Sequence, residues 1–208
     1  MALICISSYA QNEEQGITHY LFPEFNQGTI LMKTGDTREA LLNNNSLTEE
    51  MIFEINGRKL AIAPRDIAGM DTIFIKKRKF VPMEEYFIEI IYDSECELFM
   101  EHKCDVRAPG KPSGYGGTTK TTAVTSISSI SSGGMMYELK LPEGYEIGPY
   151  NYYWLKREGE MHLLKNMRDI KKFYKEKEDI YKAHMKEHDV KFKDQESIIQ
   201  LIEYLESN

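Results

Sequence analysis

The chain has 208 residues, of which 41% are hydrophobic and 11% aromatic, which is enough to form the core of one domain. Its formal net charge of −7 is unlike the basic surface of a nucleic-acid-binding domain. No run of about twenty apolar residues is present that could span a membrane. We therefore expect neither a nucleic-acid partner nor a transmembrane segment.

The first residues are apolar and then small, which is typical of the end of a secretory signal. Ser8-x-Ala10 fits the small-x-small pattern at which signal peptidase cuts. We expect residues 1–10 to be the remnant of a signal peptide, and the protein to be exported to the periplasm or the cell surface. The alternative is an ordinary first strand over Ala2–Ile6. A lipid anchor at Cys5 is less favoured, because Ile4 stands where such signals prefer a small residue.

Residues 25–107 contain short strand patterns that follow one another closely. Asn56-Gly57 is the strongest hairpin signal, and Pro64–Gly69 is typical of a loop or a single helical turn. This series predicts a body of antiparallel strands, folded as a sandwich or small barrel. The expected strands are Gly28–Lys33, Thr37–Leu42, Glu50–Ile55, Arg58–Ala63, Asp71–Lys76, Lys79–Met83, Tyr86–Tyr92 and Glu95–Val106.

Two cysteines fall within the last of these strands. Cys96 and Cys104 lie on one face of it, and eight residues of strand span roughly 26 Å, far beyond the roughly 7 Å Cα separation that a disulfide tolerates. Two buried free thiols are expected unless the chain turns between them. His102 beside Cys104 is a weak nucleophilic pair, because no carboxylate is indicated that would orient the histidine.

Residues 108–134 form a connection rich in Gly, Ser and Thr that nearly matches a phosphate-binding loop. The match begins at Gly114 and ends at Lys120-Thr121, but Thr119 takes the place of the second glycine. A β-branched residue is costly where the backbone needs positive φ, and the following residues form helix poorly. We interpret the segment as a long connection in which Tyr115 and the glycines around it are a candidate ligand-binding loop.

The remainder, residues 135–208, changes from strands to helices. Asn166 is expected to cap a first helix, and a second runs from about Lys177 to Glu187. A third starts at Asp194 and carries an apolar stripe. The expected strands are Met136–Leu141, Tyr152–Lys156 and Met161–Leu164, and the stripe is Ile198, Leu201, Ile202 and Leu205. The predicted fold class is therefore α+β, an antiparallel β sandwich or small barrel followed by a C-terminal helical region.

Aromatic residues are concentrated between 145 and 154. Strand alternation places Tyr152 and Trp154 on one face and Tyr153 on the other, so at least one face has to pack inward. Tyr150, Tyr152 and Trp154 are the candidate residues of a module that binds a glycan or another small ligand by stacking.

His184-x-x-Glu187-His188 matches the pattern of inverted zinc peptidases. Histidines four apart share one face of a helix and can chelate zinc, with the intervening glutamate as a base. A third ligand would have to come from Glu196, Glu203 or Glu206. A lysine-rich surface helix is the simpler interpretation, so a zinc hydrolase with His184 and His188 as ligands is the last alternative.

Several segments together resemble a group of uncharacterised exported proteins of the Gram-negative cell envelope. The segments are Gly28-Thr-Ile-Leu-Met-Lys, Ala40-Leu-Leu-Asn, Arg78-Lys-Phe-Val-Pro82, Gly110-Lys-Pro, Gly114-Tyr-Gly-Gly-Thr118 and the closing helix Glu196–Leu205. The resemblance implies an envelope location and no particular activity.

No complete catalytic pattern is present. Gly-x-Ser-x-Gly is absent, and the acid pairs Glu49-Glu50 and Glu84-Glu85 are typical of solvated turn edges. We therefore expect a non-enzymatic binding or structural protein of the bacterial envelope, without a cofactor, whose partner is an envelope protein or a small ligand.

Overall fold

The computed structural model describes residues 19–94, 96–107, 111–112, 118–119 and 146–208. The expected signal-peptide remnant at 1–10, the strand Met136–Leu141, Tyr115 and most of the 108–134 connection lie outside the described residues. Those expectations stay predictions.

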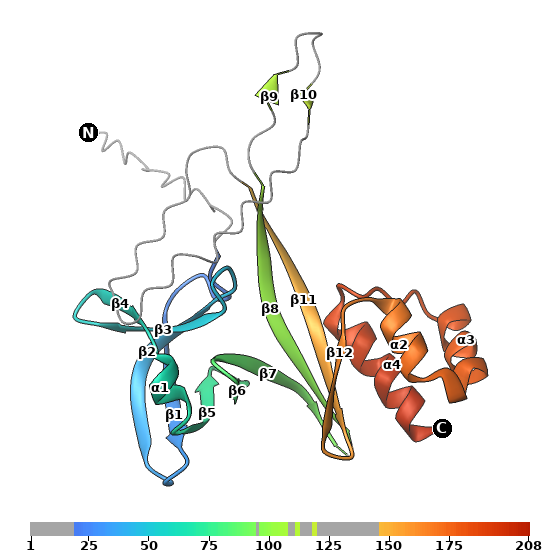
Figure 1. Ribbon diagram of the computed structural model, residues 1–208, viewed down its shortest axis with the longest axis horizontal. Helices are drawn as coiled ribbons and strands as arrows, with labels where there is room; N and C mark the ends of the chain where they lie inside the picture. Colours follow the sequence, from blue (N-terminus) through green and yellow to red (C-terminus); the bar gives the residue numbers. More distant parts are fainter. Residues whose placement is uncertain (1–18, 95, 108–110, 113–117, 120–145) are drawn as a thin grey trace, which may run out of the picture.

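Ten strands form one antiparallel sheet in the order β12-β11-β8-β7-β6-β5-β1-β2-β3-β4, and β9 and β10 form a second, two-stranded sheet (Figure 1). The strands are β1 (Asn26–Met32), β2 (Thr37–Asn45), β3 (Glu50–Ile55), β4 (Arg58–Ala61), β5 (Met70–Ile75), β6 (Arg78–Met83), β7 (Tyr86–Asp93), β8 (Glu97–Arg107), β9 (Lys111–Pro112), β10 (Thr118–Thr119), β11 (Glu146–Arg157) and β12 (Glu160–Leu164). The helices are α1 (Pro64–Ile67), α2 (Met167–Phe173), α3 (Glu178–Glu187) and α4 (Gln195–Ser207), with a 3₁₀ turn at Lys175–Lys177.

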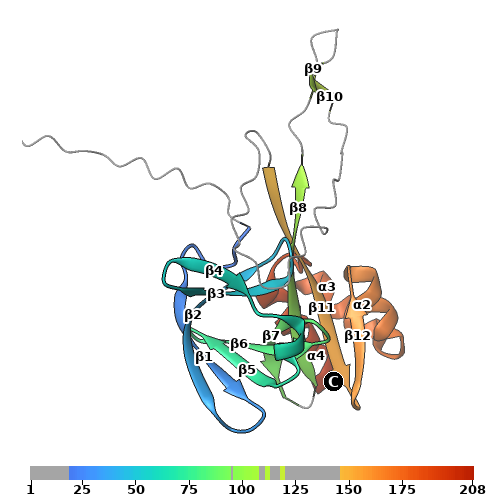
Figure 2. The same cartoon turned by 60° about the vertical axis from the view of Figure 1, so that its left-hand side comes forward.

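The large sheet is not closed, since β4 and β12 are its two edges. The α+β class and the C-terminal helical region are confirmed, whereas the sandwich or barrel detail is not. The sheet nevertheless curls strongly (Figure 2). The backbone N–H of Cys104 in β8 donates to the carbonyl of Ser46, just after β2, at 2.9 Å, although four strands lie between β2 and β8 in the sheet order.

The curled N-terminal strands enclose one core. Gly28 lies where β1 passes close to both of its neighbours, because a Cβ there would lie 2.7 Å from the Phe74 carbonyl oxygen and 2.8 Å from Cδ1 of Leu42. Only glycine fits at this point without displacing backbone. The core consists of Phe22, Ile30, Leu42, Met51, Ile62, Ile67, Met70, Ile73, Ile75, Phe80 and Phe87.

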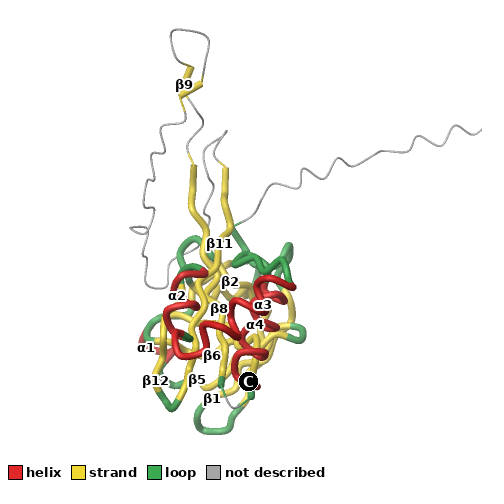
Figure 3. The backbone as a smooth tube through the Cα atoms, turned by 90° about the vertical axis from the view of Figure 1, so that its right-hand side faces the viewer, coloured by secondary structure: helices red, strands yellow, loops and turns green. Residues whose placement is uncertain are grey.

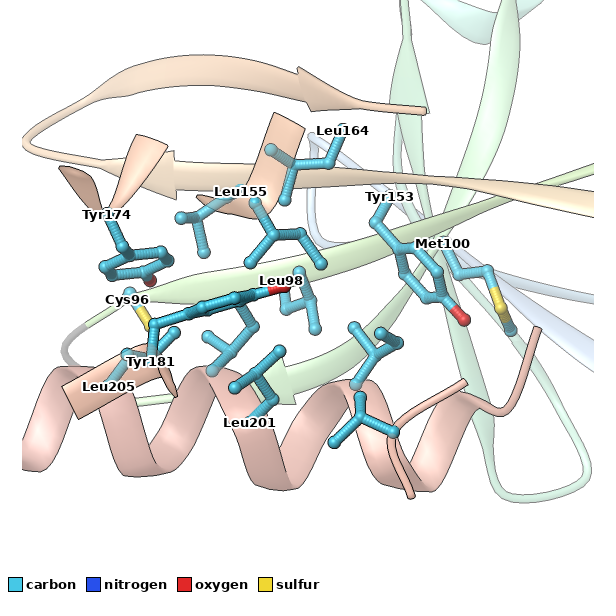
Figure 4. Packing of buried hydrophobic residues seen from close by; sticks show 14 residues of the cluster. Cys96, Leu98, Met100, Tyr153, Leu155, Leu164, Tyr174, Tyr181, Leu201 and Leu205 are labelled. Carbon is cyan, nitrogen blue, oxygen red and sulfur yellow. The ribbon is translucent and has the colours of Figure 1, made fainter. Parts of the chain in front are cut away.

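A second core lies where the C-terminal helices cover one face of β8, β11 and β12 (Figure 3). The expected apolar stripe of α4 is confirmed, since each of its four residues is fully buried. Figure 4 shows Leu201 and Leu205 of α4 pointing toward Leu98 and the rings of Tyr174 and Tyr181. Strand β11 contributes Tyr153 and Leu155 to this packing.

Local sequence signals behave as expected. Asn56 and Gly57 have φ of 52° and 72°, as the predicted tight turn requires. The side chain of Asn166 accepts from the backbone N–H groups of Arg168 and Asp169 and so caps α2.

Cys96 and Cys104 are both buried, and neither forms a disulfide. Within the described residues, no helix has the length and apolar character needed to cross a membrane.

Candidate functional site

The candidate site begins with the aromatic residues of β11. Tyr153 is fully buried and faces the helices (Figure 4), so the alternating residues Tyr150, Tyr152 and Trp154 face the opposite side of the sheet. All three are partly exposed. The rings of Tyr150 and Tyr152 meet edge to face, with centroids 5.4 Å apart. We call these three residues the aromatic strip. The predicted placement of Tyr152 and Trp154 on one face, opposite Tyr153, is confirmed.

Strand β8 provides the polar partners of the strip. The register pairs Tyr152 with Glu101 and Tyr150 with Lys103. Nε1 of Trp154 donates to Oε2 of Glu101 at 2.8 Å, and Nζ of Lys103 donates to Oε1 of the same carboxylate at 2.7 Å. Glu101 is only 5% exposed. One buried carboxylate therefore fixes both the indole and the lysine.

Lys103 also reaches the turn between β2 and β3, where its ammonium lies 2.6 Å from Oε1 of Glu49. Burial alone would lower the pKa of Lys103, but hydrogen bonds and charges from Glu101 and Glu49 outweigh it and raise that pKa. Lys103 consequently stays charged. Its ammonium lies 5.7 Å from the centroid of the Tyr152 ring, and that of Lys165 lies 5.5 Å from the same centroid.

Beyond Glu49 lies a cavity of about 330 Å³, which we call the turn pocket. Its floor is apolar and includes Met51, Ile62 and Ile67. Its polar lining is Thr48, Glu49, Glu50, Glu85 and Tyr86. Lys103 connects this pocket to the aromatic strip, because it contacts Glu49 on one side and Tyr152 on the other.

The hydroxyl of Tyr86 stays protonated in the environment of the turn pocket. Burial, followed by the negative charges of Glu101 and Glu49, raises the pKa of Tyr86 to about 12. Its hydroxyl is therefore available as a hydrogen-bond donor at any physiological pH.

The turn pocket was not predicted from the sequence. Glu49-Glu50 and Glu84-Glu85 were expected to be solvated turn edges, and Glu84 and Glu85 are indeed exposed. Glu49 and Glu50 are partly buried and line the pocket together with Glu85. Positions 49 and 85 meet only because the sheet curls, and no local pattern in the sequence announces that contact.

A second polar cluster occupies the helix-side face of β8, between the two cores. Nε of Arg78 donates to Oε1 of Glu89 at 2.5 Å, and Nε2 of His102 lies 2.7 Å from Oε2 of Glu89. Burial lowers the pKa of His102 despite the carboxylate beside it. Burial alone would raise the pKa of Glu89, but hydrogen bonds from Arg78 and His102 outweigh burial and lower that pKa. The charges of this cluster satisfy one another.

The pair formed by His102 and Cys104 gains no support as a catalytic dyad. Burial, then the charges of Asp105 and Glu49, raises the pKa of the Cys104 thiol to about 12. A thiol that stays protonated at neutral pH is a poor nucleophile.

His184 and His188 lie together at the end of α3. Their rings stack with centroids 4.4 Å apart, and the ring of His184 also packs on Tyr204 of α4, 4.8 Å away. In the part of the chain that the structure describes, no group of three His, Cys, Asp or Glu side chains could hold a metal ion. The zinc hypothesis thus gains no third ligand from these residues.

Comparison of the chain with protein-family models, curated proteins and solved structures finds no match in any of the three.

Proposed function

We propose that this protein is a non-enzymatic binding protein of the bacterial cell envelope, and that it binds a glycan along the aromatic strip. The observation that carries the proposal is that Tyr150, Tyr152 and Trp154 share one face of β11 and are all partly exposed. A row of ring faces suits the C–H faces of successive sugar rings, which are apolar.

Polar groups beside the strip suit the hydroxyls of such a ligand. Glu101 holds the indole of Trp154 in one orientation, so little side-chain freedom is lost when a ligand binds. The ammonium groups of Lys103 and Lys165 are donors next to the Tyr152 ring. Lys165 is exposed, so its ammonium is accessible to a ligand.

Two features support binding rather than catalysis. The Cys104 thiol is held protonated, and the charge of Glu89 is balanced by Arg78, with His102 as a further hydrogen-bond partner. Export is supported by the small-x-small pattern of residues 8–10 and by the resemblance to envelope proteins. Cell fractionation of the natural host, with a tag after Asn208, tests the location. Recovery of the tagged chain in the cytoplasm alone would contradict export.

The single tryptophan of the chain makes the glycan proposal directly measurable. Titration with cello-, chito- and malto-oligosaccharides should change Trp154 fluorescence saturably for at least one series. Tyr152→Ala should weaken that binding by about tenfold or more, since truncation of a stacking ring removes about 1.4 kcal/mol or more. Tyr204→Ala is the matched control, because Tyr204 is 38% exposed and lies on α4. Fluorescence that does not respond to any of the three series would refute the proposal.

A further inference from the structure

Buried polar atoms without a partner are concentrated at one end of β2 and β3. Six such side-chain atoms occur among the described residues. One of them, the hydroxyl of Tyr153, lies in the core beneath the C-terminal helices. The other five are Nε2 of His19, Oδ1 of Asn44, Nδ2 of Asn45, Oγ1 of Thr48 and Oε2 of Glu50. His19 belongs to this end because its carbonyl accepts from the N–H of Ser46 at 2.8 Å. Buried polar groups are normally paired, so these atoms are available to bond to a ligand or to water.

The register places these residues on two faces of the sheet, because Asn44 and Asn45 are successive residues of β2. Asn45 is paired with Glu50, and Asn44 with Met51, so each pair shares one face of the sheet. Nδ2 of Asn45 is a donor and Oε2 of Glu50 an acceptor, yet the two are not bonded to each other. Glu50, Thr48 and Met51 all line the turn pocket. Two of the five unpartnered atoms, Oγ1 of Thr48 and Oε2 of Glu50, therefore belong to residues that line the cavity.

The chemistry of the lining narrows the ligand. It offers both donors and acceptors, and a hydroxyl group is the simplest ligand group that can satisfy either. Glu49, Glu50 and Glu85 make the lining acidic, which disfavours an anionic ligand. Met51, Ile62 and Ile67 provide an apolar floor for a C–H face. A bare metal ion is not favoured, since the described residues contain no three-ligand cluster.

We propose that the turn pocket binds one neutral or amino monosaccharide unit, whose hydroxyls bond to Thr48, Glu50 and Tyr86. The cavity of about 330 Å³ lies at the lower end of the range of small-molecule sites. This inference rests on the proposed glycan-binding function and extends it. Lys103 contacts both Glu49 and Tyr152, so the pocket and the aromatic strip form adjacent subsites for the end and the body of one glycan.

The test uses the full chain and three probes, D-glucose, D-glucosamine and D-glucuronate, with binding measured by saturation-transfer NMR and calorimetry. Glucose or glucosamine should bind saturably, and glucuronate should bind at least about tenfold more weakly. Thr48→Val should weaken the binding by about tenfold or more, because it removes one hydroxyl and keeps the shape. Glu50→Gln should reduce the preference over glucuronate, because it removes one of the three carboxylates of the lining. Glu24→Gln, which makes the same change of charge at an exposed position, should leave all three affinities unchanged.

Tyr152→Ala separates this inference from the proposed function. It should weaken oligosaccharide binding and leave the monosaccharide affinity unchanged. A silent Trp154 titration with oligosaccharides, together with saturable monosaccharide binding that Thr48→Val weakens, refutes the strip and supports the pocket. The inference is overturned if neither glucose nor glucosamine binds saturably. It is overturned equally if they bind and both folded variants, Thr48→Val and Glu50→Gln, bind them like the original chain.

Discussion

The indole N–H of Trp154 donates to a carboxylate oxygen of Glu101 at 2.8 Å, although the two residues lie 53 positions apart in the chain. The other oxygen of Glu101 accepts from Lys103, which in turn contacts Glu49. One buried carboxylate thereby links β11, β8 and the turn between β2 and β3. The geometry of the strip and the position of the turn pocket depend on the same side chain.

Replacement of Glu101 by alanine should therefore destabilise the fold as well as release Trp154. Two hydrogen bonds to a charged group are lost, and we expect the free energy of unfolding to fall by about 2–3 kcal/mol. Urea unfolding measures this, and the emission maximum of Trp154 reports the freed indole. Glu24→Ala, at an exposed position, should change the stability by no more than about 0.5 kcal/mol. Equal, small effects of the two substitutions would show that Glu101 does not organise this face.

The arrangement of the strip follows from local patterns, and its partners do not. Alternation along β11 separates Tyr152 from Tyr153, and the apolar stripe of α4 follows from helical spacing. Side chains near in sequence determine both features. The bonds of Glu101 depend on the register between β8 and β11, which is set by pairing across a long insertion.

The turn pocket is harder still to predict, because it depends on the curl of the sheet. Glu49 and Glu85 belong to different hairpins, and each alone is an ordinary polar turn residue. The strand order could not be deduced from strand patterns either, since β1 pairs with β5 as well as with β2. Strand patterns in the sequence indicate where strands form, but they do not indicate which distant strands become neighbours in the sheet.

Gly28→Ala tests the close approach that lets β1 sit between β2 and β5. The new Cβ would clash with the Phe74 carbonyl oxygen, which cannot move without disturbing the ladder. We expect a loss of about 1–3 kcal/mol of stability. Gly69→Ala is the matched control, since a Cβ there finds only ordinary contacts at 3.6 Å. Thermal unfolding of both variants decides the matter, and a Gly28→Ala protein as stable as the control would contradict the packing.

Alkylation tests the environment of Cys104. Because burial and nearby carboxylates raise the pKa of its thiol to about 12, iodoacetamide at pH 8 should modify Cys104 at least about a hundredfold more slowly in the native protein than in urea. Peptide mapping by mass spectrometry follows this residue separately from the other cysteines. Rapid modification of Cys104 under native conditions would mean that the end of β8 opens readily.

Acidification should destabilise the protein through His102. Its pKa is lowered by burial in the folded state, so the unfolded chain binds a proton more readily than the folded chain does. The stability that this difference provides is complete above the unfolded pKa, near 6.5, and is lost as the pH falls toward the folded pKa. Glu89 acts in the same direction at lower pH, because its pKa is also lowered in the fold.

The measurement is the urea concentration at the midpoint of unfolding, determined at several pH values from 7.5 to 5. His102→Gln should be less stable than the original chain at pH 7.5 because a contact to Glu89 is lost, yet its midpoint should fall less steeply on acidification. His19 and His184 also have lowered pKa values, so part of the pH dependence should remain. An unchanged slope in His102→Gln would show that His102 is not a proton-linked element of the junction between the two cores.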